Sequence, residues 1–212
     1  MGVASDALRP TILTGQWGLL RPLEAARDAA DLYRLTHGAH AAELWADMKI
    51  GPFPSGAAFR THLEDMLADP SRSFFAIAAP DGAALGWLCL MEVQWAHLSM
   101  ELGYVMFGPP LQRTRLATEA FFLIMSHIFD DLAFERLEWP CAASNLKSRK
   151  AASRLGFQFE GLMRHKLILK GVTHDIPLYS LLATEWPARK LAMQRWLSPS
   201  NFINGEQISP LG

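Results

Sequence analysis

The spacing of apolar residues along the chain alternates between helical and strand periods. Apolar residues at three- and four-residue steps predict helices over residues 24–36, 40–49, 55–68, 116–132, 145–155 and 185–197. Apolar runs bounded by turn residues predict strands over residues 16–23, 73–79, 84–91, 100–107, 136–142, 157–170 and 174–182. Pro80-Asp81-Gly82 joins the second and third strands and is typical of a hairpin turn. We therefore expect a mixed α/β fold, in which helices cover both faces of one mixed sheet.

Two of the predicted strands end where a helix begins, and each of these corners carries polar residues. Gly108-Pro109-Pro110 stops the strand at 100–107, and the next helix opens on the basic turn Gln112-Arg113-Thr114-Arg115. The helix after the strand at 136–142 opens on Asn145 and Ser148. A helix start presents unpaired N–H groups and the positive end of the helix dipole, which suit a phosphate. The two corners together indicate a site for a phosphorylated cofactor.

Length and composition narrow the class of protein. The chain has 212 residues, of which 50% are hydrophobic and 19% are charged, so a folded globule is expected. We expect a loose segment at 1–15, a single domain at 16–197 and a tail at 198–212. The net charge of −1 argues against a nucleic-acid-binding protein.

No export signal, membrane segment or metal-binding motif is evident in the sequence. The N-terminus lacks a basic start followed by an apolar run, and no apolar run approaches the ~20 residues that a membrane-spanning helix needs. Cys89 and Cys141 lie in apolar segments without metal-ligand spacing, so we interpret both as free thiols. We expect a soluble cytoplasmic protein with no metal and no membrane partner.

Four motifs resemble the GCN5-related N-acetyltransferase (GNAT) family, in particular the branch of ribosomal-protein N-terminal acetyltransferases. The resemblance covers about residues 16–197 and rests on the order and spacing of the motifs. They are Glu101-Leu102-Gly103-Tyr104; Gln112-Arg113-Thr114-Arg115-Leu116-Ala117; Asn145-x-x-Ser148 followed by Leu155-Gly156-Phe157; and Leu178-Tyr179-Ser180-Leu181-Leu182 running into Glu185-Trp186.

The resemblance implies an enzyme that uses acetyl-CoA to acetylate an amine, either a protein N-terminus or a small molecule. It implies a twisted, mostly antiparallel sheet of about seven strands, in which the strand at 101–107 splays from that at 136–142 to form the acetyl-CoA cleft. The expected cofactor contacts lie along the splayed strand, the basic turn and the second helix start. They are Val105, Met106, Phe107, Gln112, Arg113, Thr114, Arg115, Leu116, Ala117, Thr118, Asn145 and Ser148.

Two positions depart from the family pattern. Arg115 stands where relatives have Gly, so Arg113 and Arg115 either contact phosphate or form an ordinary solvated basic turn. Ala152 stands where many relatives carry a Tyr that protonates the leaving thiolate. Ser148 is then the nearest polar candidate for that role, and its alternative role is to cap its own helix.

Glu101 is the expected catalytic base, because an amine must lose its proton before it attacks a thioester. The alternative is a solvent-facing or ion-paired edge residue. Glu92 is a weaker candidate near the acceptor, and Trp45 is the expected pocket wall. Backbone N–H groups near Val105 or Met106 are expected to stabilise the oxyanion.

Other function classes stay open or are disfavoured by the sequence. A non-catalytic acyl-CoA-binding or protein-interaction module on the same fold is the alternative that Ala152 and Arg115 keep open. A Rossmann-type dinucleotide enzyme is disfavoured, because no Gly-x-Gly-x-x-Gly follows the first strand. The sequence specifies neither the acceptor nor the oligomeric state.

Overall fold

The computed structural model describes residues 8, 10–204 and 206–211, and in this part of the chain eight strands form one mixed sheet. The order across the sheet is β1-β2-β3-β4-β5-β6-β8-β7. The strand bounds are β1 Leu13–Thr14, β2 Leu19–Pro22, β3 Ser73–Ala78, β4 Ala84–Gln94, β5 Ser99–Phe107, β6 Arg136–Pro140, β7 Gln158–Leu169 and β8 Val172–Leu182. The predicted mixed α/β fold is confirmed, and the short strand β1 accounts for the eighth member.

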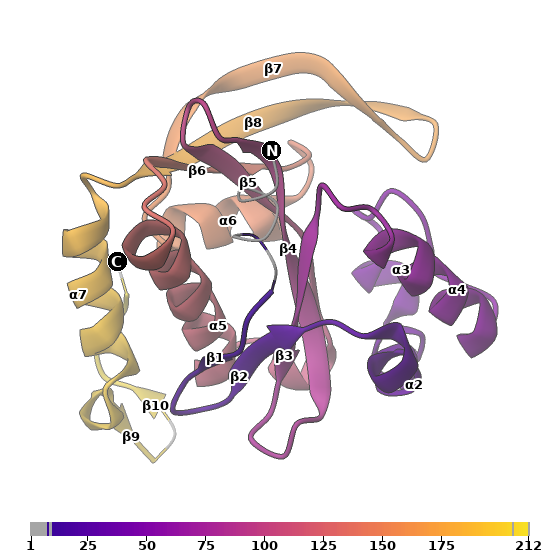
Figure 1. Ribbon diagram of the computed structural model, residues 1–212, viewed down its shortest axis with the longest axis horizontal. Coiled ribbons are helices and arrows are strands. Elements are labelled where there is room, and N and C mark those ends of the chain that lie inside the picture. Colours follow the sequence, from indigo (N-terminus) through magenta and orange to yellow (C-terminus); the bar gives the residue numbers. More distant parts are fainter. Residues whose placement is uncertain (1–7, 9, 205, 212) are drawn as a thin grey trace.

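Helices cover both faces of the sheet, as Figure 1 shows. One face packs against α5 (Arg115–Ser126), the π-helical turn η2 (His127–Asp131), α6 (Leu146–Arg154) and α7 (Trp186–Leu197). The other face packs against α2 (Ala25–Thr36), α3 (Ala41–Leu44) and α4 (Gly56–Leu67). Leu102 of β5 lies in the first core and Met106 in the second, because an irregularity between them shifts the alternation of side chains by one residue. A β5 side chain therefore belongs to one of two chemically separate faces.

The sheet opens between β5 and β6. Only three register pairs join these parallel strands, and the last of them is Glu101 with Glu138. Beyond that pair β5 continues to Phe107 and β6 to Pro140 without pairing to each other. A bulge in β5 accompanies the opening, since its register against β4 shifts where Tyr104 takes a left-handed φ of 49°. The predicted splay of these two strands is confirmed, and it exposes backbone polar groups of β5.

The C-terminal segment that the sequence marks as a tail packs against the domain in its described residues. Residues 198–212 contain the turn η3 (Pro199–Asn201) and the hairpin β9 (Phe202–Ile203) and β10 (Glu206–Gln207), and the side chain of Leu211 is buried in the first core. The buried Asn201 amide donates to Trp196 O and Ser209 O and accepts from Ser209 N. The segment docks because Leu211 packs in the core and the buried Asn201 amide has hydrogen-bond partners. The local composition of the segment does not predict these contacts.

The N-terminal segment also differs from its expected loose form where the structure describes it. The expectation for residues 1–15 falls partly on residues 1–7 and 9, which lie outside the described residues. Leu13 and Thr14 form β1 and pair with Leu20 and Leu19 of β2. The buried Glu119 carboxylate of α5 accepts hydrogen bonds from Gln16 N and Trp17 N, at 2.7 and 2.8 Å. A side chain more than a hundred residues away thus fixes this turn.

Most predicted element bounds agree with the structure to within a few residues, and two helices are shorter than expected. The helix predicted at 40–49 is limited to Ala41–Leu44. The helix predicted at 116–132 changes from α to π geometry after Ser126. Ser55 caps α4 as predicted, since its hydroxyl accepts from Ala58 N.

Candidate active site

Glu101 lies at the vertex of the opening between β5 and β6. It belongs to the last pair that joins the two strands, and its side chain is half-buried. Its neighbours Met100 and Leu102 pack into the first core, so Glu101 points to the α2–α4 face of the sheet. A Cβ added to Gly103 would lie 3.1 Å from Glu101 Oε1, so the carboxyl group lies along the β5 backbone.

Burial raises the pKa of Glu101 to about 7. The negative charges of Glu92 and Glu138 contribute to this rise after burial, and the positive charge of Lys49 opposes it. Glu92 is exposed and sits in the irregular end of β4, with a left-handed φ of 50°. Glu92 therefore affects the protonation of Glu101 through its negative charge.

The first corner leads from β5 into α5. After the turn η1 (Pro109–Leu111), Thr114 caps α5, since its hydroxyl accepts from Ala117 N at 3.1 Å and donates to Leu111 O at 2.7 Å. The Gln112 side chain donates to Phe107 O, which ties the turn to the end of β5. Within the described residues, the amide groups of Arg113, Arg115 and Leu116 donate to no backbone or side-chain acceptor. These N–H groups meet at a helix start, where an anion is stabilised.

The two arginines of this corner differ in their surroundings. Arg113 is exposed and takes a left-handed φ of 59°, whereas Arg115 is the first residue of α5. The Arg115 guanidinium lies 3.8 Å from the ring centroid of Phe202 and 4.5 Å from that of Trp17. Arg115 thus carries a helical backbone without glycine, and its charged group stacks on the docked C-terminal segment.

The second corner leads from β6 into α6 and carries Asn145 and Ser148. Asn145 caps the helix, since its Oδ1 accepts from Ser148 N at 2.9 Å. Trp139 of β6 donates from Nε1 to Ser148 Oγ at 2.8 Å. This bond uses an acceptor lone pair of the hydroxyl and leaves its proton free to be donated. Ala152 is fully buried, so α6 offers no hydroxyl at the position where relatives carry Tyr.

Two residues of this corner were not singled out as site residues by the sequence. The sequence did not identify Trp139 as a site residue, because an aromatic residue in a predicted strand is expected to lie in the core. Cys141 lies just beyond β6, where burial raises the pKa of its thiol and the neighbouring Ser148 side chain opposes that rise. The Ser148 hydroxyl is therefore oriented by an indole and lies near a sulfur atom.

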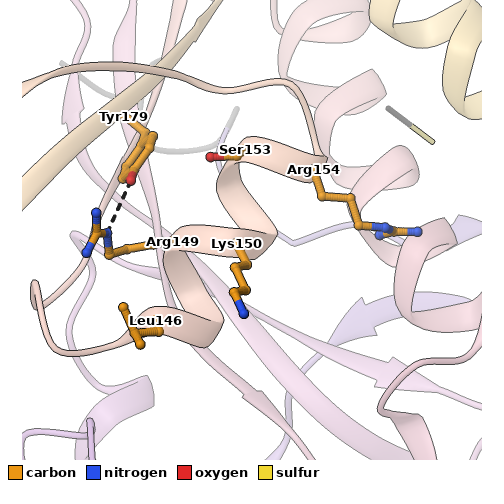
Figure 2. A pocket seen from close by; sticks show the side chains of 6 residues that line it. All are labelled: Leu146, Arg149, Lys150, Ser153, Arg154 and Tyr179. Atoms are coloured by element: carbon orange, nitrogen blue, oxygen red, sulfur yellow. Dashed lines mark hydrogen bonds between the residues drawn. The ribbon is translucent and has the colours of Figure 1, made fainter. Parts of the chain in front are cut away.

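A basic cavity of about 610 Å³ borders α6, as Figure 2 shows. It is lined by Leu146, Arg149, Lys150, Ser153 and Arg154 of α6 and by Tyr179 of β8. Arg149 donates to the Tyr179 hydroxyl at 3.4 Å. Arg154 donates to Thr118 Oγ1 at 3.1 Å, which joins this cavity to the first turn of α5. Arg154 thus places a cation beside the first turn of α5, and the sequence motifs did not single it out.

A second cavity, of about 300 Å³, lies on the α2–α4 side of β5. Its wall combines aromatic, apolar and charged side chains from the α3–α4 region, the start of β3, and β5. They are Trp45, Met48, Lys49, Ile50, His62, Asp65, Met66, Arg72 and Tyr104. Trp45 lines this cavity, while its Nε1 donates to Thr36 O in the core, so only part of its ring is available. Burial lowers the pKa of His62, which favours its neutral form.

The β7–β8 hairpin arches from the sheet toward α3, as Figure 1 shows. Lys170 at its tip donates from Nζ to Trp45 O at 2.6 Å. Lys147 of α6 pairs with Glu43 of α3. These contacts bridge the open ends of β5 and β6, so the opening is bounded on the side of α3.

The described part of the chain has neither a membrane-spanning helix nor a metal-binding cluster. None of its helices is both long and apolar enough to cross a membrane. None of its groups of His, Cys, Asp and Glu has an arrangement that would hold a metal ion.

The family profile of the Acetyltransferase (GNAT) domain matches residues 19–158. This range includes β5, β6 and both corners. Among solved structures, a GCN5-related N-acetyltransferase from Brucella melitensis superposes with a TM-score of 0.93 and 35% identity, covering 96% of this chain and 93% of that chain.

Two bacterial relatives show how varied the acceptors of similar proteins are. YdaF of Bacillus subtilis (strain 168), a candidate ribosomal N-acetyltransferase, is 31% identical over 110 residues, which is 52% of this chain and 60% of that protein. The spermidine N(1)-acetyltransferase of Escherichia coli (strain K12) is 26% identical over 152 residues, which is 72% of this chain and 78% of that protein.

Proposed function

The chain belongs to the GNAT acetyltransferase family, and we propose that it transfers an acetyl group from acetyl-CoA to a primary amine. The acceptor is a protein N-terminus or a small-molecule amine. The observation that carries the proposal is the opening of the sheet after the Glu101–Glu138 pair, with a carboxyl group of raised pKa at its vertex. A base of that pKa suits an amine substrate near neutral pH.

The residues around the opening fit acetyl-CoA. The free amide groups of Arg113, Arg115 and Leu116, with the nearby Arg154 guanidinium, would hold the pyrophosphate. The β5 backbone from Val105 to Phe107, which has no partner strand on the β6 side, would pair with the pantetheine amides. Bound there, acetyl-CoA supplies an activated acetyl thioester with a thiol as leaving group.

Three groups of the chain then act on the reacting atoms. Glu101 accepts the proton of the amine, directly or through a water, because an alkyl amine with a pKa near ~10 is protonated at neutral pH. Backbone N–H groups near Val105 or Met106 stabilise the negative charge that develops on the carbonyl oxygen. Ser148, held by Trp139, donates a hydrogen bond to the departing thiolate and passes it a proton taken up from solvent. The amine attacks directly, without an enzyme-bound acetyl group.

Thiol release from acetyl-CoA, measured over a panel of amines and peptides, tests the proposal. We expect acetyl-CoA to bind in calorimetry and at least one primary amine to be acetylated, with mass spectrometry showing the acetyl group on nitrogen. Binding without turnover across the panel would support the non-catalytic acyl-CoA-binding module instead. Absence of binding would contradict both readings of the site.

A further inference from the structure

We propose that the acceptor is a small zwitterion, whose amine lies at the Glu101 carboxyl and whose carboxylate is held by Lys49 and Arg72. The inference rests on the proposed function and names the substrate class of the same site. It follows from the cavity beside Tyr104 and from the separation of charge between that cavity and the vertex of the opening.

The cavity has the size and position of an acceptor site. Its volume of about 300 Å³ lies at the lower end of the range for small-molecule pockets. Tyr104 lines it from β5, three residues beyond Glu101, and both residues face the α2–α4 side of the sheet. The charge of Lys49, another wall residue, acts on Glu101. The cavity therefore lies on the same side of β5 as the proposed base, three residues along the strand.

Two cations, Lys49 and Arg72, lie beside Tyr104 in the wall of the cavity. Lys49 Nζ lies 6.0 Å and the Arg72 guanidinium 5.1 Å from the ring centroid of Tyr104. Arg72 uses Nε for Asp69 at 3.3 Å, and its terminal nitrogens donate to no acceptor among the described residues. Lys49 has no ion pair within the same part of the chain. Both cations can therefore bind an anionic group.

The vertex of the opening is negatively charged. The charges of Glu92 and Glu138 both act on the Glu101 carboxyl, and of these two neighbours Glu138 is paired with Arg136 at 2.8 Å. An incoming ammonium group is attracted to these carboxylates before it loses its proton. Among the wall residues of the cavity, Asp65 is the acidic one, and the neutral form of His62 beside it adds no charge.

A zwitterion matches both ends of this charge pattern. A monoamine places its ammonium group at the Glu101 carboxyl but offers no anionic group to Lys49 and Arg72. A polyamine such as spermidine brings its second cation toward these two cations, where like charges repel. A free amino acid and a peptide with an N-terminal acidic residue both present an amine near a carboxylate, so they share the recognised chemistry.

The test compares kcat/KM for three acceptors with four-carbon chains: γ-aminobutyrate, n-butylamine and putrescine. We expect γ-aminobutyrate to exceed n-butylamine by about fivefold or more and putrescine by about tenfold or more. Peptide amides that begin with Asp or with Lys form a second arm. A preference for the Asp peptide over γ-aminobutyrate assigns the carboxylate to the side chain of a peptide's first residue, and the reverse assigns it to a free small molecule.

Charge reversal at Lys49 tests directly whether this residue binds the carboxylate of the acceptor. Lys49→Glu should shift the ratio of γ-aminobutyrate to putrescine by about tenfold or more in favour of putrescine, and Arg72→Gln should shift it in the same direction. Arg195→Glu is the matched control, because Arg195 is exposed on α7, on the other face of the sheet. Its ratio should equal that of the wild type.

The outcomes separate this inference from the proposed function. Equal kcat/KM for the three acceptors overturns the zwitterion inference and leaves the acetyltransferase standing. A wild-type preference that neither Lys49→Glu nor Arg72→Gln changes also overturns it. If acetyl-CoA binds but no amine or peptide is acetylated, the proposed function fails, and the inference fails with it.

Discussion

Trp139 Nε1 lies 2.8 Å from Ser148 Oγ and donates a hydrogen bond to it. The indole is buried between the rings of Phe121 and Phe157, at centroid distances of 5.3 Å to each. Packing therefore fixes the position of the Trp139 indole, and its hydrogen bond fixes the orientation of the Ser148 hydroxyl. A hydroxyl whose lone pair is occupied in this way presents its proton to a second partner.

Trp139→Phe should lower kcat by about fivefold, the value of one lost hydrogen bond, with little change in KM for acetyl-CoA. Ser148→Ala should lower kcat by about 10²-fold or more, because it removes the proton donor itself. Steady-state kinetics check both variants. Trp196→Phe is the control, since Trp196 is also buried and donates from Nε1, to Gln207. An equal loss of kcat in Trp196→Phe would contradict an orienting role for Trp139.

The pH profile of the reaction should report Glu101. Because the base must be deprotonated, kcat/KM should rise with pH through about 7 and then level off. Glu101→Gln should lower kcat/KM by about 10²-fold or more and abolish this acid limb. Glu92→Gln removes a like charge, so it should keep the plateau and move the limb to lower pH. An unchanged limb in Glu101→Gln would exclude Glu101 as the base.

Glu101 should also make the stability of the protein depend on pH. Its pKa is about 7 in the folded chain and near 4.5 in the unfolded chain, so between these values the folded state binds more protons. Stability from this group is thus present below about pH 4.5 and is lost as the pH rises through about 7. Glu101→Gln should therefore be more stable than the wild type by about 2 kcal/mol near pH 8, with little difference near pH 4.

Urea denaturation of both proteins at the two pH values measures this difference. Glu160→Gln is a control of opposite sign, because hydrogen bonding to Arg136 lowers the pKa of Glu160 to about 2. It should lower stability at neutral pH. A difference between Glu101→Gln and the wild type that is the same at both pH values would exclude the raised pKa.

Arg115 and Arg113 should contribute to different properties of the protein. Arg115→Ala should lower the free energy of unfolding by about 1 kcal/mol, because it removes the stacking on Phe202 and Trp17. Arg113→Ala should weaken acetyl-CoA binding by about threefold and reduce its salt dependence. Thermal melts and calorimetry at two salt concentrations measure these effects. A larger loss of affinity in Arg115→Ala than in Arg113→Ala would place the Arg115 charge at the phosphate instead.

The sequence predicted the order of elements because their ends are set by local chemistry. Gly108-Pro109-Pro110 stops β5 wherever the strand lies, and Ser55 caps α4 through a bond to Ala58 three residues away. Gly156, with φ +93°, ends α6 for the same local reason. The sequence also predicted the helix starts after β5 and β6. It therefore identified the polar residues at these two corners.

The chain by itself determined the fold family, the two corners and Glu101 as a candidate base. Only the tertiary structure decided that Trp139 orients Ser148, that Arg115 stacks on Phe202, and that burial raises the pKa of Glu101. It also decided that the last residues dock and that Lys49 and Arg72 meet beside Tyr104. Caps and turns act over a few residues, whereas desolvation, stacking and charge proximity depend on segments that approach only when the sheet is complete.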